Sequence, residues 1–279
     1  MSHSQEFSNS FEAASCVMAV RKDLRVPTTD HRDLGGKVHL ADRFAAEVLQ
    51  NGVGVLRAVF APDEVDRARQ TVLAHVDLMK NTRPTVSSRH LAGFHRFPVL
   101  EPLHHLITGN RQISEALTNL LGPYYRTIGL SDITINRSQQ WHKDLLRGQF
   151  SHHLDHEGPC ANNHGKMFKV ILYTQDSSSL LVVPGSHRQD ISLESDSFAT
   201  PAEDVPVSRV ETRAGDAVVI DICTTHRGSA EEAFESKEVS DSPKILISTV
   251  FGRYNCTFGD AMERGNAERL SWWQRSSSP

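Results

Sequence analysis

The sequence predicts an α+β fold, mainly β, in which N-terminal helices flank a jelly-roll core. Before Gly122, apolar residues recur at helical spacing. After Gly122, the apolar runs are short, rich in β-branched residues and separated by clusters of Gly, Pro, Asp and Ser. Such runs are typical of an antiparallel sandwich or barrel, and helices followed by strands are typical of the α+β class.

The first half of the chain is predicted to be mostly helical. Residues 1–38 show little periodicity and are expected to form an irregular lead-in, and residues 39–279 a single domain. Gly52 and Gly122 are helix stop signals, and Pro62 followed by acids is a helix start. The predicted elements are a helix over Leu40–Leu49, a strand over Val53–Phe60, a helix from Pro62 to about Met79 and a helix over Leu103–Leu121.

The second half is predicted to be a series of strands. Trp272 and Trp273, near the end of the chain, are expected to cover the core or to form a dimer contact, and residues 276–279 to be frayed. The predicted strands are Thr127–Ile135, Met167–Thr174, Leu180–Val183, Val205–Thr212, Ala217–Cys223 and Ile245–Phe251.

Composition excludes several classes of protein. The 279 residues carry a net charge of −4, with a pI near 6.4, which gives no indication of nucleic acid or of an anionic membrane. No apolar run is long enough for a transmembrane helix, and the N-terminus lacks the order of a signal peptide. The four cysteines form no Cys-x-x-Cys pair, which argues against structural zinc and a disulfide scaffold. We expect a cytoplasmic monomer or homodimer that acts on a small molecule.

A His-x-Asp motif indicates a metal site. It lies in residues 140–144 (QWHKD), at the end of an extended segment, where residues i and i+2 project to the same face. His142 and Asp144 can therefore offer a nitrogen and an oxygen to one ion. His226, which follows the turn 214–216, is the candidate third ligand. Two histidines and one carboxylate with open positions are the ligand set of non-haem Fe(II) oxygenases.

A second His-x-Asp pair leaves an alternative open. His153 and Asp155 have the same spacing, but Gly158 and Pro159 follow them closely, so that this segment is expected to be a loop. The residues alone do not decide which pair binds the metal.

The order of motifs along the chain resembles the phytanoyl-CoA dioxygenase family of 2-oxoglutarate oxygenases, over roughly residues 45–255. The matching segments are Leu121-Gly122, QQWHKD (139–144), the strand KVILY (169–173), VVPGSHR (182–188), AGDAVVID (214–221) and His226. The resemblance implies a double-stranded β-helix (jelly-roll, cupin-like) fold with Fe(II), 2-oxoglutarate as co-substrate and O₂. Its spacing from Gly122 favours His142 and Asp144 over His153 and Asp155.

The resemblance also implies a cation for the distal carboxylate of 2-oxoglutarate. The family usually has an arginine four residues before a serine, and here Lys244 stands four residues before Ser248. This is a departure, because lysine is a point charge without the bidentate fork of arginine. Arg253 and Arg227 are alternatives for this role.

The segment 147–156 then becomes an insertion at the mouth of the site. Its members Arg147, His153, Asp155 and His156 are candidate substrate contacts, and a solvated polar loop is the alternative interpretation.

The sequence thus predicts an Fe(II)- and 2-oxoglutarate-dependent dioxygenase that hydroxylates an unactivated C–H bond, with release of succinate and CO₂. One alternative is a non-enzymatic jelly-roll binding protein whose metal site has decayed, and the intact His/Asp/His set weighs against it. Another is a cupin-type metalloenzyme that does not use 2-oxoglutarate, which has no need of a buried cation at Lys244.

Overall fold

The computed structural model describes residues 37–81, 88–189, 205–229 and 242–275, and the statements below refer to these ranges. Residues 37 and 38 already belong to the first helix. The remainder of the expected lead-in and the expected frayed tail lie outside the described residues.

The elements follow one another as helices and then strands. The helices are α1 (Lys37–Asn51), α2 (Pro62–Ala74), α3 (Glu101–Thr108), α4 (Arg111–Leu121) and α5 (Thr257–Arg275). The strands are β1 (Val53–Leu56), β2 (Lys80–Asn81), β3 (Arg89–Ala92), β4 (Tyr125–Ile135), β5 (Met167–Tyr173), β6 (Ser177–Val182), β7 (Ser208–Thr212), β8 (Ala217–Asp221), β9 (His226–Arg227) and β10 (Ile245–Arg253). Short 3₁₀ turns are η1 (Val76–Leu78), η2 (Phe94–Arg96), η3 (Gly148–Leu154), η4 (Cys160–Asn162) and η5 (Ser186–Arg188).

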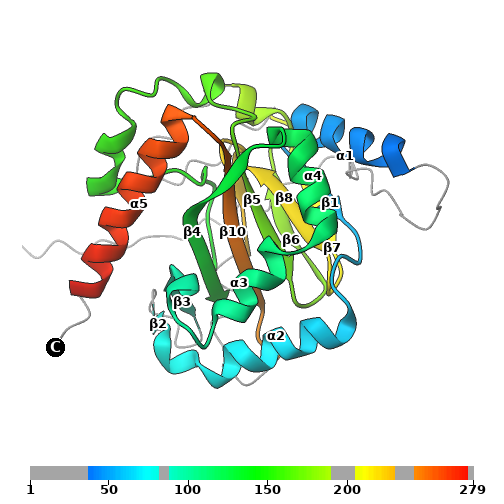
Figure 1. Cartoon of the computed structure of the whole chain (residues 1–279), viewed down its shortest axis with the longest axis vertical. Coiled ribbons are helices and arrows are strands. Elements are labelled where there is room, and N and C mark those ends of the chain that lie inside the picture. The colour runs from blue at the N-terminus through cyan, green and yellow to red at the C-terminus, as the bar shows by residue number, and fades with distance from the viewer. Residues whose placement is uncertain (1–36, 82–87, 190–204, 230–241, 276–279) are drawn as a thin grey trace, which may run out of the picture.

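Two antiparallel sheets form the core (Figure 1). The large sheet has seven strands in the order β1-β8-β5-β10-β4-β3-β2, and the small sheet has three in the order β7-β6-β9. The predicted α+β class and jelly-roll core are confirmed. Buried apolar side chains of both sheets form one cluster: Val53, Val55, Ile171, Tyr173, Leu180, Val182, Val210, Val218 and Ile220.

The helices α1 to α4 cover the other face of the large sheet (Figure 1). Successive strand residues point to opposite faces, so that Phe168 and Val170 of β5 join a cluster with Phe44 of α1 and Leu117 of α4. The six strand runs predicted after Gly122 all coincide with strands, with ends that differ by at most three residues. None of the described helices has both the length and the apolar character that crossing a membrane requires.

The predicted helix over Leu103–Leu121 is wrong in one respect, because the chain forms two helices there. α3 ends at Thr108 with Gly109 as its C-cap, and Asn110 is the N-cap of α4. The Asn110 side chain accepts hydrogen bonds from the backbone N–H groups of Gln112 and Ile113, at 3.0 and 3.2 Å. Such an N-cap satisfies donors that the interior of a continuous helix would not expose.

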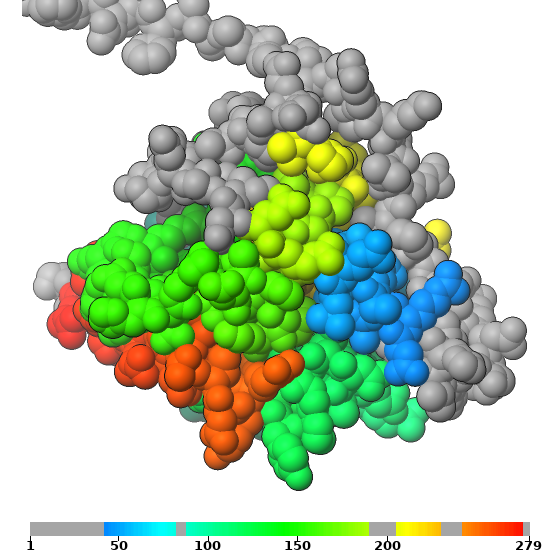
Figure 2. Space-filling model, turned by 90° about the horizontal axis from the view of Figure 1, so that it is seen from above, coloured from blue at the N-terminus to red at the C-terminus, as the bar shows by residue number. Residues whose placement is uncertain are grey.

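The C-terminal helix α5 was not predicted, and it closes one side of the molecule. It packs against η3 of the insertion, and Figure 2 shows the green insertion lying beside the orange helix. The two approach closely at Gly265, where an added Cβ would lie 3.0 Å from the ring of His153 in η3, and 2.2 Å from Leu146 just before it. Trp272 and Trp273 belong to this helix, and the ring of Trp273 meets His90 edge-on at 5.4 Å.

Asp216 holds the end of β1 to the start of β8. Its carboxylate, 4% exposed, pairs with Arg57 and accepts the backbone N–H groups of Ala58 and Arg213, at 2.9 and 2.8 Å. β1 therefore ends at Leu56, before the predicted Phe60, because the chain turns at Ala58 with a φ of 48°.

Asp216→Ala should lower the free energy of unfolding by about 3 kcal/mol, because it leaves a partly buried guanidinium and two backbone donors without their acceptor. Urea denaturation measures this change. Asp63→Ala is the matched control, since its pair with Arg67 is exposed on both sides, and it should hardly move the midpoint. Equal effects of the two substitutions would contradict the role given to Asp216.

Candidate active site

A short antiparallel bridge brings the two histidines of the predicted site together. The backbone N–H of His142 donates to the carbonyl of His226, and the reverse bond is also made, each at 2.8 Å. Two residues on, the N–H of Asp144 donates to the carbonyl of Ile222 at 2.9 Å. Two segments far apart in the sequence are thus held in one register.

The three side chains converge in that register. One carboxylate oxygen of Asp144 lies 3.6 Å from Nε2 of His142, and the other lies 3.6 Å from Nε2 of His226. The ligand atoms of these residues all lie within 4.8 Å of one another. This arrangement agrees with the predicted facial set of two imidazoles and one carboxylate.

Hydrogen bonds from the backbone fix both imidazole rings. Nδ1 of His142 contacts the carbonyl of Gln140 at 2.6 Å, and Nδ1 of His226 contacts the carbonyl of Thr224 at 2.9 Å. A carbonyl only accepts, so each Nδ1 carries the proton and each Nε2 turns a lone pair toward the centre. Metal-binding histidines are oriented in this way.

Electrostatics keeps the three groups in the protonation state that a metal requires. Burial, together with the nearby His142, lowers the pKa of His226 to about 3, and burial also lowers the pKa of His142. Burial alone would raise the pKa of the Asp144 carboxyl, but Lys169 and His226 hold it well below its usual range. Nε2 of His142 is buried and has no hydrogen-bond partner. A neutral imidazole with an unused lone pair beside a carboxylate fits a divalent cation.

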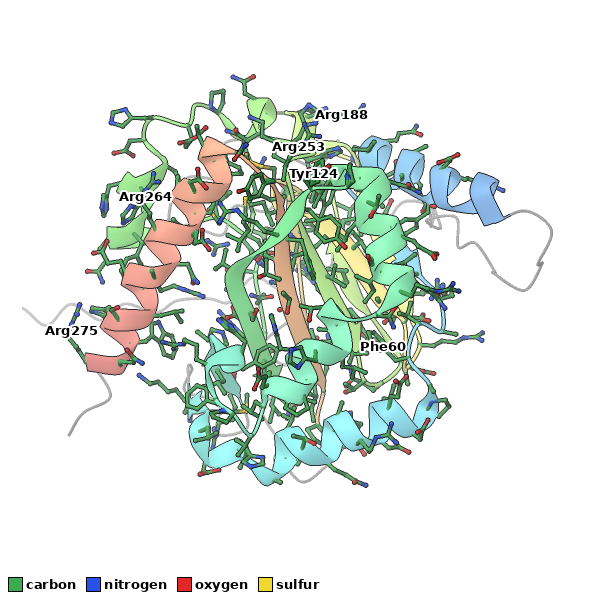
Figure 3. The ribbon with its side chains drawn as sticks, viewed as in Figure 1. Phe60, Tyr124, Arg188, Arg253, Arg264 and Arg275 are labelled. Atoms are coloured by element: carbon green, nitrogen blue, oxygen red, sulfur yellow. A yellow bond between two sulfur atoms is a disulfide. The ribbon has the colours of Figure 1, made fainter. Side chains whose placement is uncertain are left out.

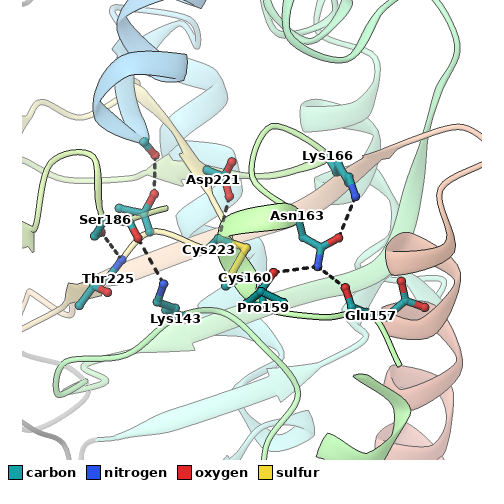
Figure 4. The surroundings of a disulfide bond; sticks show 12 residues. Lys143, Glu157, Pro159, Cys160, Asn163, Lys166, Ser186, Asp221, Cys223 and Thr225 are labelled. Atoms are coloured by element: carbon teal, nitrogen blue, oxygen red, sulfur yellow. Dashed lines mark hydrogen bonds between the residues drawn. A yellow bond between two sulfur atoms is a disulfide. The ribbon is translucent and has the colours of Figure 1, made fainter. Parts of the chain in front are cut away.

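The VVPGSHR segment (182–188) holds the backbone just before His226 in place. The hydroxyl oxygen of Ser186 accepts the backbone N–H of Thr225 at 2.8 Å (Figure 4). The imidazole of His187 contacts the carbonyl of Leu49 at 3.0 Å, which ties the same turn to α1. These contacts give the motif a structural role as a turn that joins α1 to the segment before His226.

A disulfide joins Cys160 of η4 to Cys223, three residues before His226 (Figure 4). The sequence argued against a disulfide scaffold, and the pairing of these two cysteines was not predicted. They are 63 residues apart in the sequence, and spacing alone cannot reveal a pair that the fold brings together.

Asp221, at the end of β8, also holds this part of the chain. Its carboxylate accepts the backbone N–H groups of Gly165 and Cys223, at 2.6 and 2.9 Å. The disulfide and these two hydrogen bonds therefore fix the chain just after β8.

A cavity of about 330 Å³ opens beside the three residues. Lys244 lines it, and its ammonium group donates hydrogen bonds to the hydroxyls of Ser179 and Ser229. Burial lowers the pKa of Lys244 to about 8. The neighbouring wall includes Tyr173 and Ser248. The sequence therefore identified a cation that the structure places in the same cavity as the candidate metal site.

Two arginines that the sequence predicted as ligand contacts differ in their position relative to the cavity. Arg147 lines the cavity, and its guanidinium donates to the carbonyl of Lys143 at 2.7 Å. Arg253 does not line it: it is exposed at the far end of β10 (Figure 3). The reason is strand periodicity, because Lys244, Ser248 and Val250 face the cavity from even positions and Arg253 is out of phase.

The predicted substrate contacts His153, Asp155 and His156 also lie outside the cavity lining. Nε2 of His153 lies 2.7 Å from the carboxylate of Glu268 on α5, and Asp155 and His156 are exposed. His153 is therefore part of the packing between η3 and α5. With His152 and Glu268 it forms the second group of possible metal ligands among the described residues, but that group is largely exposed and does not include Asp155.

Lys169 is a residue of the candidate site that the sequence did not predict. It lies in β5, and its Nζ is 3.2 Å from both oxygens of Asp144. Its only signal in the sequence is a charge in the apolar run Met167–Tyr173, where alternation places it on the same face as Ile171 and Tyr173.

The family model for phytanoyl-CoA dioxygenase (PhyH) matches residues 48–233, well over half of the chain. The chain belongs to the phytanoyl-CoA dioxygenase family. Membership of this family places it among the non-haem iron- and 2-oxoglutarate-dependent oxygenases. No curated protein sequence matches it.

Solved structures show the same fold at low sequence identity. The epimerase SnoN in complex with Fe³⁺, α-ketoglutarate and nogalamycin RO is 20% identical with a TM-score of 0.57, over 77% of this chain and 84% of that one. HygX from Streptomyces hygroscopicus with nickel and 2-oxoglutarate is 15% identical (TM-score 0.54; 76% and 87% covered). The carbocyclase SnoK from nogalamycin biosynthesis is 18% identical (TM-score 0.54; 81% and 87% covered).

Substitution of the converging residues should abolish metal binding. His142→Ala, Asp144→Ala and His226→Ala should each weaken Ni(II) binding, measured by calorimetry, by more than about a hundredfold. Loss of a residue that only orients a ligand already costs 10–100-fold. His153→Ala and Glu268→Ala are the controls for the exposed group and should retain the affinity. Loss of binding in these two variants and retention in the first three would reverse the assignment.

Proposed function

We propose that this family member is an Fe(II)- and 2-oxoglutarate-dependent oxygenase that holds its iron on His142, Asp144 and His226. Its reaction is the hydroxylation of an unactivated C–H bond of a small molecule, with release of succinate and CO₂. The observation that carries the proposal is a His/Asp/His cluster that shares a cavity with the partly buried Lys244. Its two imidazoles are buried and turn unprotonated Nε2 atoms toward the carboxylate.

The cavity offers a place for each end of 2-oxoglutarate. Three protein ligands leave open metal positions for its keto acid end, and Lys244 supplies a positive charge for its distal carboxylate. Ser179 and Ser229 hold the Lys244 ammonium group in place. Bound iron would supply the activation of O₂ that the amino acids lack.

The remaining task of the protein is to orient the substrate and to exclude water. The cavity lies between the sheets and is closed on one side by η3 and α5. Apolar side chains of this part, such as Leu146, Phe150 and Met262, belong to one buried cluster. They give the substrate an apolar wall close to the metal, where an unactivated C–H bond can be held against the reactive position.

Two other functions remain as alternatives to the proposal. A non-enzymatic binding protein would release no succinate from 2-oxoglutarate, and a cupin-type enzyme would work without that co-substrate. Iron-dependent production of succinate from 2-oxoglutarate under O₂, lost on addition of zinc, supports the oxygenase. Full activity in the presence of a strong chelator contradicts it. A cytoplasmic location and a monomeric or homodimeric state stay predictions from the sequence.

Lys244→Ala should weaken the binding of 2-oxoglutarate by well over tenfold, because it leaves a carboxylate without its buried cationic partner. Ni(II) affinity, measured first without 2-oxoglutarate, should be unchanged. Lys244→Arg should restore much of the co-substrate affinity because it restores the charge. An unchanged 2-oxoglutarate affinity in Lys244→Ala would move the role to another cation of the cavity lining, which does not include Arg227.

The affinity for 2-oxoglutarate should fall as the pH rises through 8. Burial lowers the pKa of Lys244 to about 8, so that the free protein loses this charge above that pH. Between pH 7 and pH 9 the apparent Kd of the Ni(II) protein for 2-oxoglutarate should rise about tenfold. Lys244→Arg should remove the dependence, because arginine keeps its charge over this range. A flat profile in the original protein would contradict Lys244 as the anchor.

A further inference from the structure

Lys169 lies on the cavity side of the large sheet, next to the candidate metal site. Its ammonium group is 3.2 Å from each oxygen of Asp144, and the two side chains are only 17% and 14% exposed. The strand register places it between Val250 of β10 and Ile220 of β8. An ammonium group between these two apolar side chains has little access to water. It therefore needs an anionic partner both before and after a metal binds.

Metal binding changes what surrounds Lys169. In the proposed function, Asp144 is a ligand of a divalent cation. Its single negative charge, which balances the Lys169 ammonium group in the metal-free site, then also faces the two positive charges of the metal. Lys169 also contributes to lowering the pKa of Asp132, but Asp132 is already paired with Arg269 and His90. When the metal is bound, Lys169 is therefore surrounded by less net negative charge than in the metal-free site.

The charged side chains that line the cavity also leave an excess of positive charge. The described lining holds five cationic side chains and two carboxylates: Arg137, Arg147, Lys169, Lys244 and Arg269 against Asp132 and Asp144. A divalent metal and a 2-oxoglutarate dianion cancel one another, so their binding together leaves the excess of positive charge unchanged. An anionic substrate reduces this excess, whereas a neutral substrate does not.

The rest of the cavity sets the shape of such a substrate. The cavity lining also carries apolar side chains of β4, of residues 145–150 and of α5: Leu130, Leu145, Leu146, Phe150, Met262 and Trp273. The cavity, about 330 Å³, must also hold 2-oxoglutarate. It is therefore suited to a compact molecule with one charged end and an apolar body.

We propose that Lys169 is a specificity-determining residue that binds the carboxylate of an amphipathic organic acid, the substrate of this oxygenase. The inference rests on the proposed function, because it takes Asp144 as a metal ligand. The apolar body of the acid lies against the wall formed by the insertion and α5.

Matched acid and amide probes test this directly. 4-Phenylbutanoate and 4-phenylbutanamide, and octanoate and octanamide, differ in charge but hardly in shape. Each is titrated under anaerobic conditions into the protein loaded with Fe(II) and 2-oxoglutarate. Binding is measured by the change in the visible metal-to-co-substrate absorbance and by ligand-observed NMR. We expect at least one acid to bind at least about tenfold more tightly than its amide.

Substitutions assign the preference to Lys169. Lys169→Met should bind acid and amide about equally, and Lys169→Arg should keep most of the preference. Lys166→Met is the matched control: it removes a lysine three residues away that donates to Asn163 and does not line the cavity, and it should behave as the original protein.

The outcomes separate this inference from the proposal on which it rests. If the absorbance forms with Fe(II) and 2-oxoglutarate but no acid is preferred, or the preference survives in Lys169→Met, the inference is overturned and the oxygenase stands. If Lys169→Met only tightens metal binding and leaves the preference unchanged, Lys169 merely neutralises Asp144, which also overturns it. If no absorbance forms in the original protein, the proposed function fails and the inference fails with it.

Discussion

The pair of backbone hydrogen bonds between His142 and His226 is the constraint on which the site depends. It fixes the distance between a segment that follows β4 and a segment that follows β8. Neither segment carries a complete set of ligands. Because a bridge of two hydrogen bonds sets both position and register, it delivers two imidazoles and one carboxylate to the same point without a long strand on either side.

Much of the surrounding structure serves to hold the His226 side of this bridge. Ser186 accepts the N–H of Thr225, Asp221 holds the turn after β8, and a disulfide joins Cys223 to Cys160 of η4. At the other end of β8, Asp216 fixes that strand to β1. The VVPGSHR and AGDAVVID motifs are thus explained by hydrogen bonds that position His226, although none of their own residues lines the cavity.

Sequence reasoning reached the centre of the site because the signals there are local. The i, i+2 spacing of His142 and Asp144 follows from extended backbone, and the Gly-Asp turn followed by an apolar strand leads to His226. Lys244 was found because the family resemblance implies a cation four residues before Ser248. These residues needed no knowledge of how distant elements pack, and the structure brings them to one cavity.

The features that were missed depend on packing between distant elements. α5 is polar overall and contains Gly259 and Gly265, which disfavour a helix locally, and its contact with η3 stabilises it. His153 was expected at the cavity because it follows the metal motif, but it turns to Glu268 on that helix. Lys169 could be given a function only once the sheet showed which face of β5 meets Asp144.

A crystal soaked without oxygen in Fe(II) and 2-oxoglutarate tests the central claim most directly. The anomalous signal at the iron absorption edge should show one strong peak between Nε2 of His142, the carboxylate of Asp144 and Nε2 of His226. Electron density for the distal carboxylate of 2-oxoglutarate should reach Lys244. A peak at His152, His153 and Glu268 in place of that site, or a co-substrate bound away from Lys244, would contradict the account.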